Sequence, residues 1–263
     1  MITRGAAWLS DLFRVFFLDR FNAQHRPYAL QASTAARSCH FHAHARIPEK
    51  SLAELLTQIA DRPVQQVVLP GPNTQLGDVG SHTFYYTLAC LVVALQPRAI
   101  LEFGTYLGVG AYAMALNAPS QTQLYTIDLP DSAQASAAHS LNRIDQGHVA
   151  TSRGRVGQAF LGTPQAKRII QIRADSLQLR IEEHLSRAEL ILIDGGHSTP
   201  IIARDTDNAF RVLADNGVVL WDDYFHLYPD VVSYLDRLSR ERTLWRISGT
   251  NFVFYHHHSP SPA

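Results

Sequence analysis

The sequence has 263 residues, in which 23 lysines and arginines balance 23 aspartates and glutamates, and 46% of the residues are hydrophobic. This predicts one large domain, or a domain with an extension, that buries a sizeable core. No basic stripe indicates nucleic-acid binding, and no apolar run reaches the roughly 18–20 residues of a transmembrane segment. The two cysteines do not make a disulfide framework, which favours a reducing, cytoplasmic compartment.

Residues 1–79 are expected to form an accessory, mostly helical region. Residues 8–21 carry apolar side chains at helical spacing, which predicts a helix that docks on the core or on a second copy of the chain in a homo-oligomer. A peripheral membrane helix is disfavoured because the polar face is not strongly basic. Downstream, residues 48–60 predict a helix in which Ser51 and Glu54 form a capping box.

Three alternating histidines, His40, His42 and His44, form a second feature of this region. In an extended chain they would share one face, as zinc ligands do, or belong to a solvated strand or loop. The sequence has no acid or further cysteine close to these histidines, so the zinc interpretation has no support from neighbouring ligands.

From residue 80 to 256 the pattern alternates between strands and helices, which predicts an α/β domain, with a tail at 257–263. Strands are predicted at 99–103, 123–128, 168–173, 189–194 and 218–221, followed by an antiparallel hairpin of 243–247 and 252–255. Helices are predicted at 81–95, 111–116, 131–144, 176–185, 200–213 and 231–240. The polar stretch 146–165 is interpreted as a loop with a short helical piece.

A glycine turn after the first of these strands is the feature around which the domain is organised. Glu102 in the strand is followed by Gly104, Gly108 and Gly110, and then by a helix. Glycine permits positive φ and close approach of a ligand to the backbone, and the helix directs its free N–H groups at the turn. The spacing departs from the G-x-G-x-x-G dinucleotide fingerprint and from the P-loop, although an ordinary turn of an α/β protein remains an alternative.

Two acids follow the next two strands. Asp128 lies about 20 residues past the glycine turn, where a Rossmann-like fold places a carboxylate on ribose hydroxyls, but NAD enzymes share this device. A turn or helix-capping role for Asp128 is the alternative. Asp175, next to Ser176, is placed where it could cap the following helix.

Three more acids follow the fourth and fifth strands: Asp194, Asp222 and Asp223. If the strand order is 3-2-1-4-5, these strands are neighbours, and the acids converge where parallel strands end. Without a paired lysine or arginine they would repel one another, and a divalent cation resolves that repulsion. Oxygen ligands alone favour Mg²⁺, Mn²⁺ or Ca²⁺ over zinc.

These motifs together resemble class I S-adenosylmethionine-dependent methyltransferases. Residues 190–198 and 217–224, with Asp205-Thr206, are similar to the metal-dependent small-molecule O-methyltransferases, in the branch of cephalosporin hydroxylases and macrolide-sugar O-methyltransferases. Catechol O-methyltransferase is a more distant relative, and His197 stands where that enzyme has a lysine. The resemblance implies a Rossmann-like doubly wound sheet, of order 3-2-1-4-5-7-6, whose last strand is antiparallel.

The resemblance also implies the site. The metal, Mg²⁺ or Mn²⁺, would be held by Asp194, Asp222 and Asp223. The residues expected to contact S-adenosylmethionine are Glu102, Gly104, Thr105, Tyr106, Gly108, Gly110, Asp128, Asp175 and Ser176. The acceptor would be a small hydroxylated molecule, in a pocket to which Tyr106, Tyr224, Phe225, His226 and Tyr228 contribute.

Asp194 and His197 are the expected catalytic residues. A metal-bound hydroxyl has a lowered pKa, and His197 is the expected proton acceptor, because an imidazole titrates near neutral pH. A metal-shell or loop-capping role is the alternative for His197. For the chain as a whole, a metal-independent protein of methyltransferase fold is the main alternative. An NAD(P)-dependent oxidoreductase is disfavoured by the glycine spacing and the clustered acids.

Overall fold

The computed structural model describes residues 45–71, 79–132, 141 and 143–258. The chain divides into two compact units, one of which, Ile47–Tyr224 with Tyr228–Ala263, contains every described helix and strand. The other unit combines Met1–Arg46 with Phe225–Leu227. The helix predicted at 8–21 and the three alternating histidines lie outside the described residues. None of the described helices is both long and apolar enough to span a membrane.

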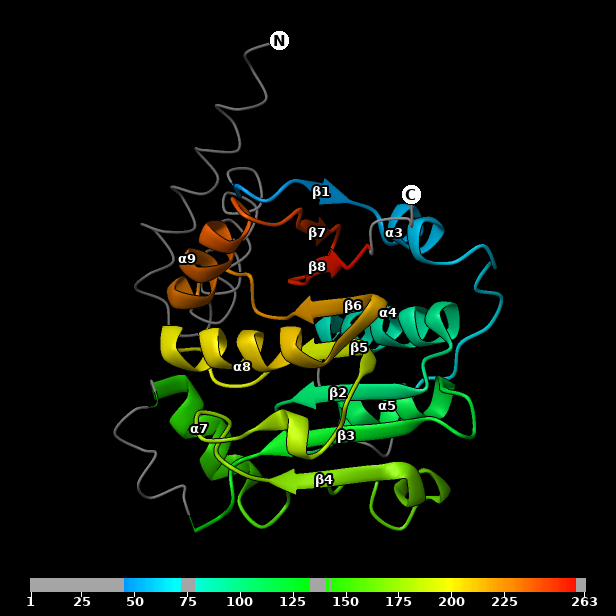
Figure 1. Ribbon diagram of the computed structural model, residues 1–263. Helices are drawn as coiled ribbons and strands as arrows, with labels where there is room; N and C mark the ends of the chain where they lie inside the picture. Colours follow the sequence, from blue (N-terminus) through cyan, green and yellow to red (C-terminus); the bar gives the residue numbers. More distant parts are fainter. Residues whose placement is uncertain (1–44, 72–78, 133–140, 142, 259–263) are drawn as a thin grey trace, which may run out of the picture. The chain divides into compact units, whose positions relative to one another are not determined.

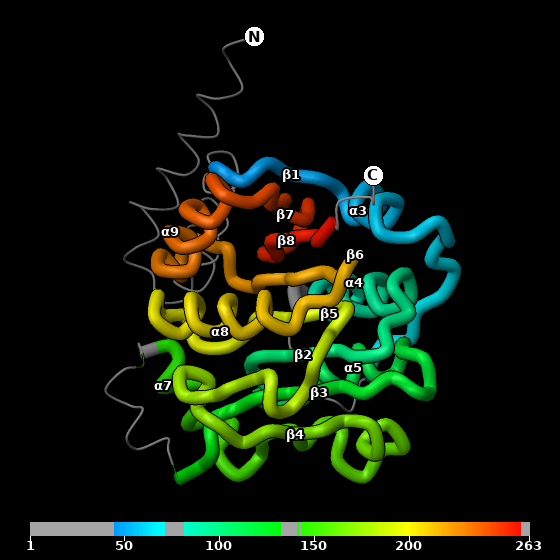
Figure 2. The backbone as a smooth tube through the Cα atoms, viewed as in Figure 1, coloured from blue at the N-terminus to red at the C-terminus, as the bar shows by residue number. Residues whose placement is uncertain are grey.

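An eight-stranded sheet runs through the larger unit in the order β1-β7-β8-β6-β5-β2-β3-β4 (Figures 1 and 2). The strands are β1 (Glu49–Lys50), β2 (Ala99–Phe103), β3 (Gln123–Asp128), β4 (Ile169–Arg173), β5 (Ala188–Ile193), β6 (Leu213–Trp221), β7 (Trp245–Ile247) and β8 (Val253–His256). β2 to β6 pair in parallel, whereas β8 runs antiparallel to β6 and to β7. The predicted order is therefore confirmed as β4-β3-β2-β5-β6-β8-β7.

The central strands are hydrophobic because both faces of the sheet are covered. Helices α4 (Val79–Leu95) and α5 (Val109–Asn117) lie on one face, and α8 (Thr199–Val212) lies on the other (Figure 1). Residues 190–192 of β5 are fully buried, and so are residues 218–221 of β6. The parallel strands end at one edge of the sheet, which places the residues after β2, β3, β4, β5 and β6 on the same side of the molecule.

The strand β1 is an addition that the sequence did not indicate. Glu49 and Lys50 pair in parallel with β7, and the Arg246 guanidinium binds Glu49 at 2.8 Å while its backbone N–H donates to Pro48. The predicted helix at 48–60 is consequently shorter, since its first residues are extended. As α3 (Leu52–Ile59), it begins after Ser51, and the predicted capping box with Glu54 is confirmed.

Two other predicted elements differ from the structure. Instead of an α-helix at 176–185, the chain forms turns and a three-residue 3-10 helix, Ile181–Glu183, because Asp175 accepts a hydrogen bond from the Leu177 N–H and closes a local turn. Helix α7 (Arg143–Ser152) starts before the stretch interpreted mainly as a loop, 146–165, and occupies its first part. Most of the helix predicted at 131–144 lies outside the described residues, whereas α9 (Pro229–Leu238) matches the predicted 231–240 closely.

The boundary expected near residue 80 stays a prediction. Residues 47–71 contribute β1 and α3 to the same compact unit as the rest of the sheet, and the buried side chain of Leu55 belongs to the hydrophobic core.

Candidate active site

The glycine turn between β2 and α5 brings backbone into unusually close contact. Gly104 has φ +97°, and a Cβ on it would lie 1.8 Å from the carbonyl oxygen of Asp194. Its N–H and that of Thr105 both donate to Ile127, which ties the turn to the end of β3. Gly108 has φ +82° and is the N-cap of α5. The turn after β2 therefore packs directly on the start of the loop after β5.

Glu102 lies in the core below this turn rather than in an open site. It is 2% exposed and accepts a hydrogen bond from Thr126. A Cβ on Gly110 would lie 2.6 Å from a carboxylate oxygen of Glu102, so the missing side chain at 110 leaves room for the acid. Burial raises the pKa of Glu102 to about 8, although the bond from Thr126 opposes that effect.

Asp128 holds the exit of β3 and the glycine turn together. One carboxylate oxygen accepts from the Tyr106 N–H at 2.7 Å, and the other accepts from the Leu129 N–H at 2.7 Å. Burial raises the pKa of Asp128 despite these two bonds, which favour the charged form. Each carboxylate oxygen has further acceptor capacity, which suits it to a pair of ligand hydroxyls.

A cavity of about 360 Å³ lies over the ends of the parallel strands. Nine residues of the predicted site line it: Gly104, Tyr106, Asp128, Asp175, Ser176, Asp194, His197, Asp222 and Asp223. Four residues of the predicted site do not line the cavity and instead belong to the strand, the turn and the helix around it: Glu102, Thr105, Gly108 and Gly110. Of the predicted acceptor-pocket aromatics in the larger unit, Tyr106 and Tyr228 line the cavity, whereas Tyr224 is buried and donates to Asp236.

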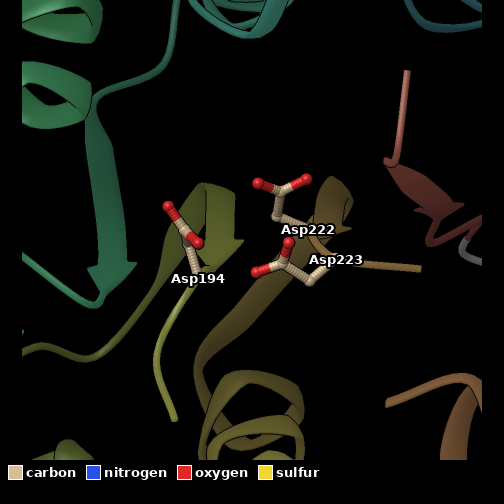
Figure 3. Close-up of side chains that lie close together, drawn as sticks. All are labelled: Asp194, Asp222 and Asp223. Carbon is tan, nitrogen blue, oxygen red and sulfur yellow. The ribbon is translucent and has the colours of Figure 1, made fainter. Parts of the chain in front are cut away.

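Three acids gather on one side of this cavity. Asp194 follows β5, and Asp222 and Asp223 follow the neighbouring β6, so that one oxygen of each lies within 4.8 Å of the others (Figure 3). Burial and the carboxylates of Asp222 and Asp223 raise the pKa of Asp194 well above its ordinary value, and burial with Asp223 does the same for Asp222. A cluster that resists ionisation in this way is a candidate cation site.

His197 stands beside the acids as a bridge between two carboxylates. Its Nε2 lies 2.5 Å from Asp223, and its Nδ1 contacts Asp145 of α7. Burial alone would lower the pKa of His197, but the bonds with Asp145 and Asp223 outweigh it and raise the pKa to about 10. Because a carboxylate can only accept, both ring nitrogens carry protons in this arrangement.

Helix α7 supplies cavity residues that sequence reasoning did not identify. Asp145, His148, Val149 and Ser152 line the cavity and are spaced as one face of a helix. The His148 ring lies 5.8 Å from that of Tyr106 and 6.1 Å from that of His197. Nothing in the local sequence marks Asp145 as a partner of a histidine 52 residues away, and the interpretation of this stretch as a loop removed the helical periodicity that groups the four.

Comparison with known proteins agrees with the fold of the larger unit. Residues 101–224 match a family model described as a methyltransferase domain. The fold is similar to that of the O-methyltransferase NovP, with 11% identity over 67% of this chain and 80% of that one and a TM-score of 0.50. It is equally similar, at 13% identity over 80% and 93% and a TM-score of 0.50, to a putative caffeoyl-CoA O-methyltransferase from Staphylococcus aureus. No curated protein matches the sequence.

The contact between Gly104 and Asp194 predicts a severe effect of Gly104→Ala. The added Cβ would overlap the Asp194 carbonyl, so we expect the free energy of unfolding to fall by about 3 kcal/mol or more. Gly249→Ala is the matched control, because Gly249 also has positive φ (+74°) but a Cβ added there would meet nothing within 4 Å. The free energy of unfolding of this control, measured by chemical denaturation, should fall by only about 1 kcal/mol. Equal losses in the two variants would contradict the packing argument.

The raised pKa of Glu102 predicts that Glu102→Gln stabilises the protein at high pH but not at low pH. Between the ordinary value of 4.5 and about 8, the folded state binds this proton more tightly than the unfolded state, so wild-type stability falls as pH rises through that window. Glutamine keeps an acceptor for Thr126 and cannot ionise. The melting temperature of the variant should match the wild type near pH 5 and exceed it at pH 9.

The exposed Glu241→Gln is the control for this pH series, and it should follow the wild type throughout. A wild-type advantage over Glu102→Gln that persists at pH 9 would show that the buried acid is not the source of the pH dependence.

Proposed function

We propose that this chain, whose residues 101–224 match the methyltransferase-domain family, transfers a methyl group from S-adenosylmethionine to a hydroxyl group of a small molecule. The observation that carries the proposal is one cavity that joins the glycine turn, Asp128 and the cluster of three acids. The glycine turn and Asp128 suit a donor that contains a nucleoside, and the acid cluster suits the activation of an acceptor oxygen. The names of the two similar structures, both O-methyltransferases, agree with an oxygen acceptor.

Each part of the donor has a counterpart in the cavity. The hydroxyls of the ribose suit the two carboxylate oxygens of Asp128, which retain acceptor capacity beside their backbone bonds. The backbone at Gly104 lacks a side chain, so the donor is able to approach the main chain closely there. Asp175 and Ser176 follow β4 and line the same cavity, which makes them candidates for the adenine end.

The residues at the acid cluster fit a divalent cation. The three side chains offer oxygen atoms alone, within 4.8 Å of one another, and burial together with their mutual repulsion raises the pKa values of Asp194 and Asp222. Mg²⁺ and Mn²⁺ prefer such ligands. When bound, the cation would stabilise the ionised form of an acceptor hydroxyl.

The side chains around the cluster would position the acceptor and take up its proton. Asp194 follows β5, whose strand is buried in the core, and its backbone carbonyl lies against Gly104, so the main chain that carries the carboxylate is held in place. His197 is a cation while both ring nitrogens face carboxylates, and in that state it cannot accept a proton. Its role as a proton acceptor therefore requires that Nε2 be released from Asp223 and lose its proton. The stacking of the Tyr228 ring on the His197 ring, 4.1 Å between centroids, would keep the imidazole in place during that change.

The same histidine supports a second candidate, a metal-independent methyltransferase. The protonated ring of His197 neutralises part of the cluster's charge through its 2.5 Å contact with Asp223. In such an enzyme the donor and acceptor would be held in line without a cation, and proximity would supply the acceleration. Removal of metal separates the two candidates.

A homo-oligomer and a cytoplasmic location remain predictions of the sequence.

Ligand binding tests the donor. Calorimetry on the purified protein should show binding of S-adenosylmethionine and of S-adenosylhomocysteine, and no binding of NAD. Asp128→Asn should weaken both sulfur ligands about tenfold or more, because an amide cannot accept from two hydroxyls as a carboxylate does. Asp215→Asn, a remote surface change, is the control. Tight NAD binding without a response to either sulfur ligand would overturn the proposal.

Metal removal tests the acid cluster. With a hydroxylated acceptor found by screening with labelled S-adenosylmethionine, transfer should stop in chelator and return with Mg²⁺ or Mn²⁺. Asp222→Asn should lose turnover by about 10²-fold or more while it keeps its affinity for S-adenosylhomocysteine, because the donor contacts lie elsewhere in the cavity. Transfer that continues unchanged after exhaustive removal of metal would instead establish the metal-independent candidate.

A further inference from the structure

Asp145 is a buried acid beside the cavity, and it has no role of its own in the proposed reaction. It belongs to α7 and contacts His197 at two points, and its side chain is only 5% exposed. One oxygen accepts from the His197 backbone N–H at 3.0 Å, and the other contacts Nδ1 of the ring. The acid therefore holds both the main chain and the side chain of the same residue.

This double contact determines which atom of the imidazole faces the acid cluster. With Nδ1 directed at Asp145, the opposite nitrogen, Nε2, lies 2.5 Å from Asp223. The contact with Asp145 therefore fixes Nδ1 on the side of α7 and leaves Nε2 as the ring nitrogen that faces the acid cluster.

We infer that Asp145 is a positioning residue, which acts through His197 by holding its backbone and its ring so that Nε2 faces the acid cluster. The inference rests on the proposed function for its effect on turnover. The other acids of the site follow strands, whereas this inference gives helix α7 a role in the site. The sequence of contacts runs from Asp145 to His197 and then to Asp223.

A purely structural role for Asp145 explains the geometry less well. Burial of a carboxylate costs several kcal/mol unless its oxygens are well bonded, so an acid is a poor choice for merely packing a helix. An asparagine in its place offers one acceptor oxygen for two donors, and its amide group would face the other donor. The contacts seen here need both oxygens of a carboxylate.

A double-mutant cycle separates the two roles. Asp145→Asn should lower kcat about 10–100-fold, the usual cost of losing such a supporting partner, with a change of less than about threefold in the KM for S-adenosylmethionine. In a His197→Gln background the same change should alter kcat less than about threefold, because the residue through which Asp145 acts is already gone. Asp215→Asn, which removes an exposed acid paired with Arg187, should leave kcat unchanged in both backgrounds. Equal factors in the two backgrounds would overturn the inference.

Nuclear magnetic resonance provides a readout that does not depend on turnover. In protein labelled with ¹⁵N-histidine, the wild type should show a strongly deshielded Nδ1 proton that is absent from His197→Gln, both without metal and with Mg²⁺. The signal should change in Asp145→Asn and persist in Asp215→Asn. Absence of this signal from the wild type would overturn the inference even if Asp145→Asn did not fold. If the wild type shows the signal but transfers no methyl group, the proposed function fails while the tie between Asp145 and His197 stands.

Discussion

The mutual repulsion of three carboxylates is the constraint on which the site depends. Asp194 and Asp222 are brought together because β5 and β6 are neighbouring parallel strands that end at the same edge, and Asp223 follows directly. The core holds the strands in register, so the acids cannot separate to reduce their repulsion. When the acids are ionised, the surroundings have to supply positive charge, which His197 does in part and a divalent cation would do more fully.

The close packing of loops makes this arrangement rigid. Gly104 lies against the Asp194 carbonyl so tightly that no side chain fits between them, and the Asp128 carboxylate ties the glycine turn to the end of β3. The proposed donor site and the acid cluster therefore share one backbone contact. A ligand bound at the turn and an oxygen held at the acids would be placed relative to each other by the protein backbone itself, rather than by mobile side chains.

Several buried acids make this site costly for the fold. Burial raises the pKa of Glu102 to about 8 and that of Asp205 to about 7, in addition to the effects on Asp194 and Asp222. Each of these groups binds a proton more tightly in the folded state than in the unfolded state, so each lowers stability as pH rises. Three of these acids, Asp194, Asp205 and Asp222, line the cavity, and such a concentration is typical of functional sites.

The sequence by itself determined the sheet, and it predicted nine of the residues that line the cavity. Apolar runs such as residues 189–193 predicted buried parallel strands, and the acids placed directly after them were expected to meet on the condition that the fourth and fifth strands are neighbours, which the sheet confirms. The capping box at Ser51 and Glu54 was also readable, since it is a contact between residues three apart. Only the tertiary structure decided that β1 joins the edge of the sheet beside β7, that Asp175 closes a turn instead of starting a helix, and that Asp145 of α7 holds His197. These features depend on side chains that are distant in the chain or on a choice between two local bonds of similar strength, and a pattern of apolar and polar residues does not carry that information.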